Sequence, residues 1–388
     1  MRIGLITNLI HEKVFIENRL AFGNSKDWMT ATGGNTGNVA FVEGIKSILG
    51  GKVQAIHWGD NPESINQHLD HIVVCCANQL GTHADLSGWA DRLSKFQLPT
   101  TFIGIGAQAD RIGEIPDLPE GTVKFLEVAS SLRSNPNHSN IVTRGAFSSS
   151  VISHYGYTSN PFGCPSQFIS PMTELGQLCI AHQKKRKNKR ILTAAGNPFH
   201  PSGIIENKLV EIVGKFNGEY VIQHPKVLFD LASQNTGELT DAQIKAVERA
   251  YSSLGKLSDI LDWFSANAVS FADAQNWMQF SKKFSQVIGP RYHGIALPIQ
   301  VGVPGKVISI DSRTEELANT TGVPYISYKD ASKLSAAELI EASAWSQRDA
   351  DHYDDIRNKN ARFYSEFLEA QGLPISDHLK ILVEEEKN

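Results

Sequence analysis

The chain has 388 residues, of which 41% are apolar and 20% charged, and its 37 basic and 41 acidic side chains leave a formal net charge of −4. These proportions are typical of globular proteins and exclude a disordered chain, a collagen-like chain and a disulfide-stapled miniprotein. The mildly acidic balance argues against a dedicated nucleic-acid binder, which usually carries a basic domain or stripe. A chain of this length is long enough for about two domains with cores of their own.

The cysteines indicate a reducing compartment. Four occur, and two of them, Cys75 and Cys76, are adjacent inside the apolar run HIVVCCAN. No C-x-x-C pair is present, so we interpret the thiols as small core side chains of a cytoplasmic protein. No apolar run reaches the length of about 18 residues that spans a bilayer, and the N-terminus lacks the features of a signal peptide. We therefore expect no transmembrane segment, with peripheral contact at a membrane left open.

Short apolar runs alternate with helical patterns along the chain, which is typical of parallel α/β sheets. The first set of expected strands comprises residues 2–9, 53–60, 71–78, 101–108 and 140–145. The second set comprises residues 190–197, 218–225, 286–289, 306–311 and 324–328. We therefore predict an α/β fold of two Rossmann-like domains that face each other across a cleft.

A change in composition separates the two sets of strands. Residues 184–190 read KKRKNKR, in which Asn188 is the one uncharged side chain, and we interpret 183–190 as a solvated basic linker in preference to a membrane or nucleic-acid patch. The predicted divisions are an N-terminal domain at 1–182, a C-terminal domain at 191–334 and C-terminal helices at 335–388. The last segment opens with a capping box of Ser335 and Glu338, and we expect its helices to pack back on the first domain.

Ligands of parallel α/β sheets bind beyond the carboxyl ends of the strands, so the turns after the strands are the first candidates for a site. In the segment QVIGPRYHGIALPIQVG a strand ends near Gly289, and Arg291, His293 and Gly294 lead into a short apolar helix. The start of a helix favours an anion, an arginine fork matches a carboxylate or a phosphate, and a histidine exchanges protons near neutral pH. The structural alternative pairs Arg291 with a core carboxylate and lets His293 cap the helix.

Arg313 follows the next expected strand. A capping box of Ser312 and Glu315 would place it on the first turn of a helix, where a cation is unfavourable for the helix itself. An anion should offset this charge, and either a neighbouring carboxylate, Asp311 or Glu316, or a bound ligand can supply it.

Two other strand ends carry residues of the same kind. Arg144 stands between the strand NIVT and a serine-rich helix start, and His224 lies at the end of GEYVIQHP. Both are candidates to face the cleft, and the alternative for each is a satisfied structural role. No H-E-x-x-H, EF-hand or G-x-S-x-G motif occurs, and metal dependence is not indicated.

A glycine-rich turn, ATGGNTGNVAF, lies in the first half of the chain. Gly33, Gly34 and Gly37 allow close backbone approach, and Thr36 or Asn38 can cap the helix that follows. The turn matches neither the dinucleotide-binding pattern nor the P-loop pattern.

Three of these segments together resemble the polysaccharide pyruvyl transferase family. GGNTGNVAF resembles the family's N-x-G-D-x-A segment, TRGAFSSSVISHYGY its R-x-x-x-S…G segment, and VIGPRYHGIALPIQVGVPGKVISID its R-x-H-G block. The last is the most specific, because Arg, His, Gly and the following G-x-P keep their spacing. Asn38 stands where the family usually has Asp, so a role for that carboxylate is not carried over, and Arg313 stands where relatives often have Lys.

The resemblance implies a GT-B-like fold and transfer of the pyruvate moiety of phosphoenolpyruvate to two hydroxyls of a sugar, with a cyclic ketal and phosphate as products. It implies no cofactor besides this donor. The implied catalytic residues are His293, as general acid or base in either order, and Arg291. The implied donor contacts are Arg144, Arg291, Arg313, Gly294 and His224, and the implied acceptor contacts are Asn35, Thr36, Asn38 and Trp28. His224 is the reserve candidate for proton transfer.

The acceptor is expected to meet the loop at residues 10–34, whose polar side chains, among them Asn18 and Arg19, suit a sugar. Trp28 either stacks on a pyranose face or covers the core. Two other functions stay open. A nucleotide-sugar glycosyltransferase would share the fold, but the sequence shows no ribose contact or base pocket. A non-catalytic sugar-binding relative would tolerate loss of the Arg/His pair, which this chain retains. The expected partners are phosphoenolpyruvate and a saccharide, with no nucleic acid.

Overall fold

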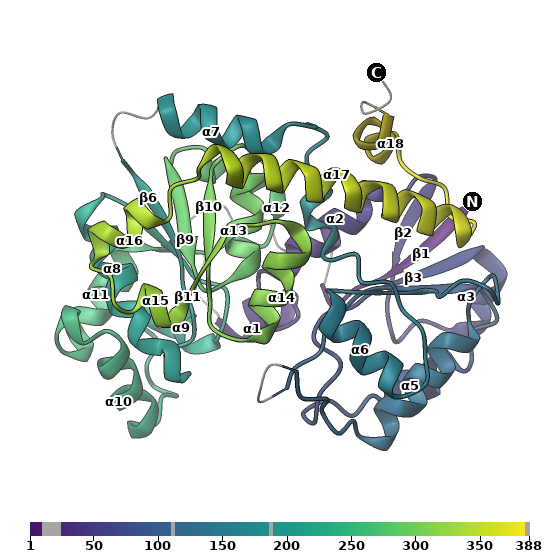
Figure 1. Ribbon diagram of the computed structural model, residues 1–388. Helices are drawn as coiled ribbons and strands as arrows, with labels where there is room; N and C mark the ends of the chain where they lie inside the picture. The colour runs from purple at the N-terminus through teal and green to yellow at the C-terminus, as the bar shows by residue number, and fades with distance from the viewer. Residues whose placement is uncertain (10–24, 110–112, 186–188, 385–388) are drawn as a thin grey trace.

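The computed structural model describes residues 1–9, 25–109, 113–185 and 189–384. Two parallel β-sheets, each flanked by helices, stand next to each other, and one long C-terminal helix runs along both (Figure 1). The predicted fold class, an α/β protein of two Rossmann-like domains, is confirmed.

The first sheet has five strands in the order β2-β1-β3-β4-β5. Its strands are β1 (Arg2–Ile6), β2 (Lys52–Ile56), β3 (His71–Cys75), β4 (Thr100–Ile105) and β5 (Ile141–Thr143). The helices of this domain are α2 (Asn38–Ile48), α3 (Pro62–His68), α4 (Ser87–Leu93), α5 (Glu120–Ser131) and α6 (Ala146–His154). Each strand overlaps a predicted apolar run, with β2 and β4 beginning one residue earlier than predicted, and β3 and β4 are buried along their full length, as expected of parallel strands covered on both faces.

The second sheet has six strands in the order β11-β10-β9-β6-β7-β8. Its strands are β6 (Ile191–Ala194), β7 (Glu219–Val221), β8 (Ala268–Val269), β9 (Gln286–Gly289), β10 (Gly305–Ser309) and β11 (Tyr325–Ser327). Its helices are α8 (Ile205–Lys215), α9 (Lys226–Ala232), α10 (Asp241–Ala250), α11 (Leu257–Asn267), α12 (Ala274–Ser281), α13 (Tyr292–Ile299), α14 (Ser312–Thr321) and α15 (Tyr328–Ala331). The edge strand β8 was not predicted, because two residues are too few to show a pattern.

The chain crosses between the domains earlier than the composition predicted. Helix α7 (Leu175–Lys185) precedes the basic tract, yet it packs on the second domain (Figure 1): the His182 ring is 2.7 Å from the carbonyl of Phe284. The predicted boundary at residue 182 is therefore wrong, and the first lysines of the predicted linker end α7. Residues 186–188 of the tract lie outside the described residues. Lys184 and Lys185, the first charges of the run, are exposed at the end of α7.

The C-terminal helices return to the first domain, as predicted. They are α16 (Ala336–Ala342), which begins with the predicted capping box of Ser335 and Glu338, α17 (Gln347–Ala370) and α18 (Asp377–Glu384). On α17 the fully buried Arg357 donates hydrogen bonds to three carbonyls, those of Gln167, Ser170 and Met172. The residues just before α18 then pack against α2, where the Ser376 hydroxyl donates to the carbonyl of Ser47 at 2.6 Å.

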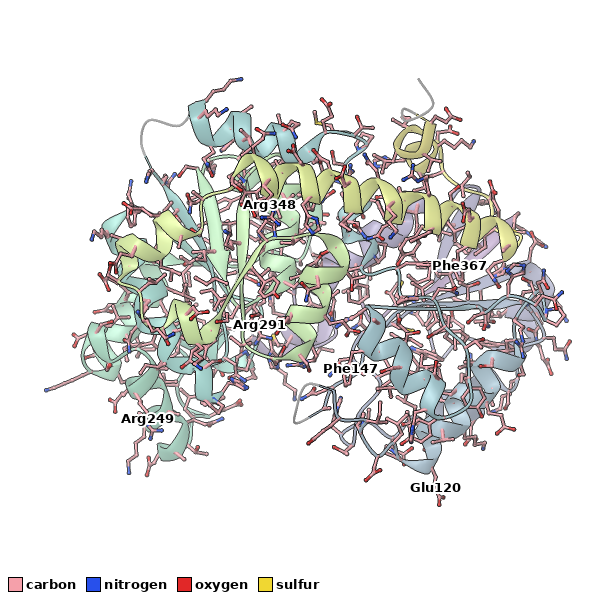
Figure 2. The ribbon with its side chains drawn as sticks, in the orientation of Figure 1. Glu120, Phe147, Arg249, Arg291, Arg348 and Phe367 are labelled. Carbon is pink, nitrogen blue, oxygen red and sulfur yellow. The ribbon has the colours of Figure 1, made fainter. Side chains whose placement is uncertain are left out.

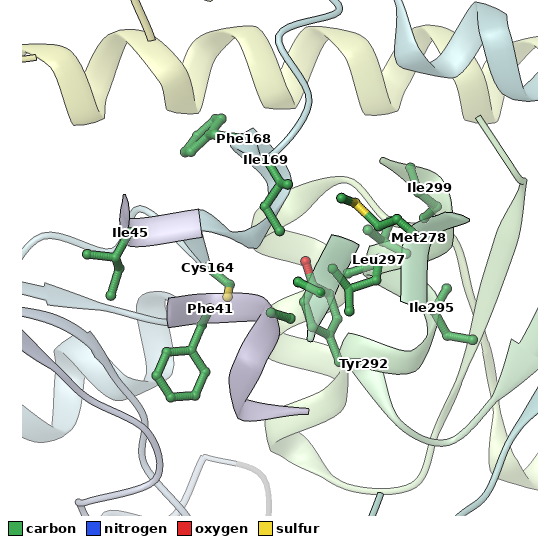
Figure 3. Packing of buried hydrophobic residues seen from close by; sticks show 14 of the residues in the cluster. Phe41, Ile45, Cys164, Phe168, Ile169, Met278, Tyr292, Ile295, Leu297 and Ile299 are labelled. Atoms are coloured by element: carbon green, nitrogen blue, oxygen red, sulfur yellow. The ribbon is translucent and has the colours of Figure 1, made fainter. Parts of the chain in front are cut away.

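A continuous apolar core joins the two domains. Phe41 and Ile45 of α2 lie on one side of this core and Tyr292 and Ile295 of α13 on the other, with Cys164 and Phe168 between them (Figure 3). Cys164 and Phe168 belong to the segment of the 3-10 helix η2 (Pro165–Phe168), which packs closely against α2. The starts of α2 and α13 are thus fixed relative to each other by buried side chains. Among the described residues, no helix has the length and apolar character needed to cross a membrane.

Candidate active site

A cavity of about 170 Å³ lies between the two domains at the carboxyl ends of strands from both sheets. Its lining comes from both halves of the chain: Asn35, Asn38, Ala77, Asn78, Arg144, Gln223, Pro290, Arg291, Tyr292, His293, Ile310, Asp311, Arg313, Thr314 and Leu317. In the second sheet the strand order reverses between β6 and β9, and the residues after β9 line the cavity. Such switch points are where open α/β sheets bind ligands.

Arg291 lies at the start of α13 and points toward the end of β6. Its Nη2 donates to the carbonyl of His224 at 3.0 Å and to that of Gly196 at 3.4 Å, and it is 3.3 Å from Nδ1 of His224. Its Nε is buried without a partner among the described residues. In the described chain no carboxylate pairs with this guanidinium, so the structural alternative, a pair with a core carboxylate, is not observed. Figure 2 labels Arg291 within the second domain and Phe147 on α6 of the first.

Arg144 enters the cavity from the first domain. It follows β5, and its Nε donates to the carbonyl of Gly104 at 3.1 Å. The stem of Arg144 occupies space that any side chain at Gly106 would take, because a Cβ there would lie 2.7 Å from Cδ of Arg144. Burial lowers the pKa of Arg144 and of Arg291, and the Arg313 cation lowers both further. The cavity is therefore short of negative charge.

Arg313 lies on the first turn of α14, as predicted, but the helix cap is one residue earlier than expected. Asp311 is the N-cap and forms the capping box with Thr314, because its extended backbone lets the carboxylate reach the Thr314 N–H at 2.9 Å. The predicted box of Ser312 and Glu315 is wrong. Asp311 also pairs with the Arg313 guanidinium, whose Nη1 donates to Oε1 of Gln108 in the first domain at 3.0 Å.

Glu316, the other carboxylate considered for Arg313, has a different role. It accepts hydrogen bonds from the backbone N–H of Ser148 at 2.7 Å and from the Ser148 hydroxyl at 2.8 Å. Helix α6 has no side-chain cap of its own at Gly145, so a carboxylate from the second domain caps this helix of the first.

His293 is the second residue of α13, and it is partly buried between the domains. Its Nε2 is 3.4 Å from Sγ of Cys164, and its ring centroid is 5.8 Å from that of Phe41. Burial, reinforced by the Arg144 cation, lowers the pKa of His293 to about 3, and burial with Arg291 lowers that of His224 to about 4. Both imidazoles are therefore neutral at pH 7, where a neutral imidazole can accept a proton.

The glycine-rich turn places Asn35 and Asn38 on the cavity, whereas Thr36 is fully buried. The backbone N–H of Thr36 donates to the carbonyl of Gln223 at 3.2 Å, which ties the turn to the second domain. We predicted that Thr36 or Asn38 would cap α2, and neither side chain does so. The N-cap is Gly37, and Oδ1 of Asn35 closes the turn by accepting its N–H at 2.8 Å.

Trp28 does not face the cavity. It lies on α1 (Ser25–Ala31), is 4% exposed and packs in the core of the second domain, where α1 meets α9. The predicted stacking of Trp28 on a sugar is therefore wrong, and its alternative, core cover, is observed. Residues 10–24 of the expected acceptor loop, with Asn18 and Arg19, lie outside the described residues.

Gly294, a predicted donor contact, does not line the cavity, and its lack of a side chain lets α13 lie close to β6. A Cβ at this position would lie 2.6 Å from both the Ala194 methyl group and Nε2 of Gln223, so a larger residue would push α13 away from β6.

Three residues near the predicted ones were missed. Gln223 and Asn78 line the cavity just after β7 and β3, and the rule that located Arg144 would have found them. Cys164, which contacts His293, carries no signal of this kind, because only the fold brings it there. The described residues contain no cluster of three or more His, Cys, Asp or Glu that would suit a metal.

The fold and the cavity define a two-domain α/β protein that collects three arginines and a neutral histidine at the junction of its domains. The model of the polysaccharide pyruvyl transferase family matches residues 35–312. The chain belongs to this family. No curated protein matched the sequence.

Solved structures similar to this chain are remote in sequence. Trehalose 6-phosphate synthase from Burkholderia multivorans is 12% identical, with 86% of this chain and 74% of that chain covered at a TM-score of 0.40. UDP-GlcNAc 2-epimerase from Neisseria meningitidis is 13% identical, with 95% and 99% covered at 0.37. A putative UDP-N-acetylglucosamine 2-epimerase from Listeria monocytogenes is also 13% identical, with 95% and 97% covered at 0.42.

Proposed function

We propose that this transferase moves the pyruvate moiety of phosphoenolpyruvate onto two hydroxyls of a saccharide, with a cyclic ketal and phosphate as products. The observation that carries the proposal is the convergence of Arg144, Arg291 and Arg313 on one cavity beside the neutral His293. Membership of the family supports a role in sugar pyruvylation.

The charge and the size of the cavity suit this donor. Phosphoenolpyruvate carries a phosphate and a carboxylate on three carbons, so it needs several cations close together. Asp311 is the one carboxylate in the lining, and Arg313 already pairs with it. Arg144 and Arg291 form no ion pair with a described carboxylate. A guanidinium can bind either the phosphate or the carboxylate of the donor through two parallel hydrogen bonds.

The reaction balances with the residues present. One sugar hydroxyl attacks C2 of the donor and gives up its proton to His293, and the imidazolium so formed passes that proton to C3, which becomes a methyl group. The C2–O bond to phosphate then breaks, the second hydroxyl bonds to C2, and its proton leaves with the phosphate. The arginines stabilise the negative charge on the departing phosphate. His293 is neutral in the free protein, and the negative charges of the bound donor would raise its lowered pKa, so we assign it the role of base in the first step.

A nucleotide-sugar donor is less well supported. The cavity lined by the three arginines is about 170 Å³ among the described residues, which is below the roughly 300–1,000 Å³ typical of ligand pockets. Helix α1 packs on α9, and the Ser25 hydroxyl on α1 donates to Asp230 on α9. We also propose a reducing, cytoplasmic location, which the four free and buried thiols support.

The test is a phosphate-release assay with phosphoenolpyruvate and a panel of β-galactosides, mannosides and glucosides. We expect release only with an accepted sugar, and a product whose mass rises by one phosphoenolpyruvate less one phosphate. Absence of release across the panel, with thermal stabilisation by a nucleotide sugar and none by phosphoenolpyruvate, would exclude the proposal.

A further inference from the structure

A second and larger cavity lies at the carboxyl edge of the second sheet. Its volume is about 670 Å³, within the range of roughly 300–1,000 Å³ that is typical of ligand sites. One wall is formed by residues 198–204, which follow β6, and another by Tyr328 of α15, which follows β11. Residues of α8 and α10 complete the lining. The proposed reaction makes no use of this second cavity.

The second cavity keeps large apolar side chains in contact with water. Phe199 is 41% exposed and Ile204 is 63% exposed, and both belong to its wall. The half-buried ring of Tyr328 lines the same cavity from a distant part of the chain. Exposed apolar side chains that gather in a hollow are typical of binding sites.

Two hydrogen-bond donors at the second cavity are left for a ligand. The backbone N–H of Ser202 donates to Nδ1 of His200 at 3.1 Å, so a neutral His200 carries its proton on Nε2, which has no partner among the described residues. Arg249 of α10 (Figure 2) forms no ion pair or hydrogen bond within the described part of the chain. No acidic side chain lines the cavity among the described residues. The cavity therefore combines aromatic rings with unused N–H groups.

Contacts within the protein hold the walls of the second cavity. Asn207 of α8 accepts the backbone N–H of Ser253 at 2.9 Å and donates to the Ser252 hydroxyl at 3.1 Å. The other wall is packed so tightly that a Cβ at Gly203 would lie 2.8 Å from the carbonyl of Pro198. The cavity is therefore formed in the free protein.

The chain joins the second cavity directly to the candidate active site. Arg291, which lines the active site, donates to the carbonyl of Gly196 at 3.4 Å. Pro198, where the wall of the second cavity begins, is only two residues further along. Two residues of chain span at most about 7 Å. A ligand that reacts beside Arg291 can therefore reach the second cavity if it continues past Gly196.

We propose that the second cavity binds a further unit of the saccharide acceptor, so that the protein acts on an oligosaccharide or polymer in preference to a single sugar. The inference rests on the proposed function and adds the length of its acceptor. The reacting unit meets His293, and the next units follow the chain past Gly196. Phe199 packs on the apolar face of a pyranose ring, and His200 and Arg249 donate to its hydroxyls.

The test is the phosphate-release assay with acceptors of one unit and of four units from the same β-galactoside, mannoside and glucoside series. We expect kcat/KM of the wild type to be higher for four units than for one. Since 41% of the Phe199 surface is left to be covered, Phe199→Ala should lower the ratio of the two kcat/KM values about 3- to 8-fold. Arg249→Gln should lower the same ratio. The matched control is Ile381→Ala on α18, which removes an apolar side chain that is 44% exposed outside the cavity and should leave the ratio unchanged.

Equal kcat/KM values for one and four units in the wild type overturn the proposal, and so does a preference for four units that Phe199→Ala and Arg249→Gln both retain. If the wild type releases no phosphate with any acceptor, the proposed function fails, and the rise in Tm with the same sugars decides the second cavity. A larger rise with four units than with one, reduced in Phe199→Ala, supports a saccharide site. The absence of a rise with every sugar, or a rise with a nucleotide sugar that Phe199→Ala removes, overturns it.

Discussion

Replacement of Arg291 by methionine tests whether this arginine binds an anionic ligand or supports the fold. The substitution keeps the length of the side chain and removes the cation. In the described chain Arg291 contacts only the carbonyls of Gly196 and His224 and the His224 ring, and its Nε has no partner. Glu206 and Asp311 attract this guanidinium without forming an ion pair with it, so its N–H groups are available to an anion.

The magnitude follows from the lost contacts. A hydrogen bond to a charged group contributes about 1.5–3 kcal/mol, so affinity for phosphoenolpyruvate should fall about 10- to 150-fold. Stability of the free protein should fall by less than in a variant of a buried arginine with three carbonyl partners, because the carbonyls of Gly196 and His224 lose a donor but no ion pair is broken and a desolvated cation is removed. If Arg291 instead belonged to a buried ion pair, removal of one partner would cost about 3–5 kcal/mol of unfolding free energy.

The assay measures both quantities on the same preparations. Thermal unfolding without ligand reports stability, and the rise in Tm with added phosphoenolpyruvate reports binding. Arg357→Met is the matched control, because this fully buried arginine donates to three carbonyls far from the cavity. It should lose stability, at about 1–3 kcal/mol for each buried carbonyl left unpaired, and still bind the donor once folded. A large loss of stability in Arg291→Met, with donor binding retained, would refute the reasoning.

Three further predictions concern the same cavity. His293→Gln should abolish phosphate release while phosphoenolpyruvate still raises Tm, and a near-normal rate would remove the proposed base. Because the pKa of His293 is lowered to about 3 and that of His224 to about 4, each from 6.5, their neutral states stabilise the fold above pH 6.5. This stability is lost as the pH falls from 6.5 toward 3, so chemical unfolding across that range should show a smaller decline in His293→Gln than in the wild type. Gly106→Ala should displace Arg144, since its Cβ would lie 2.7 Å from Cδ of Arg144, and a donor KM equal to that of the wild type would contradict this.

The sequence predicted the strands and the strand ends well, because both follow from local patterns. Uninterrupted apolar runs such as HIVVC are buried on both faces of a parallel sheet, and the turn after β9 places Arg291 and His293 at a helix start in any fold of this class. The pairing of Arg291 with Arg313 was predictable for the same reason, because the carboxyl ends of β9 and β10 lie at one edge of the second sheet. Arg144 follows β5 of the first sheet, and only the packing of the two domains brings it to the same cavity.

The failures came from contacts between distant segments. Trp28 is a large aromatic side chain in a polar loop, which suits either a sugar or a core, and only the packing of α1 on α9 decides between them. The capping box of Ser312 and Glu315 satisfied the local pattern as well as the observed box of Asp311 and Thr314. Asp311 takes the N-cap position of α14 in place of Ser312, and its carboxylate also pairs with Arg313.

The cations of the cavity come from both domains, and this would give the proposed phosphoenolpyruvate donor a second effect besides reaction. Arg144 belongs to the first domain and Arg313 to the second, and the Arg313 cation lowers the pKa of Arg144, so the two charges repel each other across the junction. The bonds from Arg313 to Gln108 and from Ser148 to Glu316 oppose this repulsion in the free protein. An anion with two charged groups between the arginines replaces repulsion by attraction on both sides. Binding of the proposed donor would therefore add to the contact between the domains that their shared core already fixes.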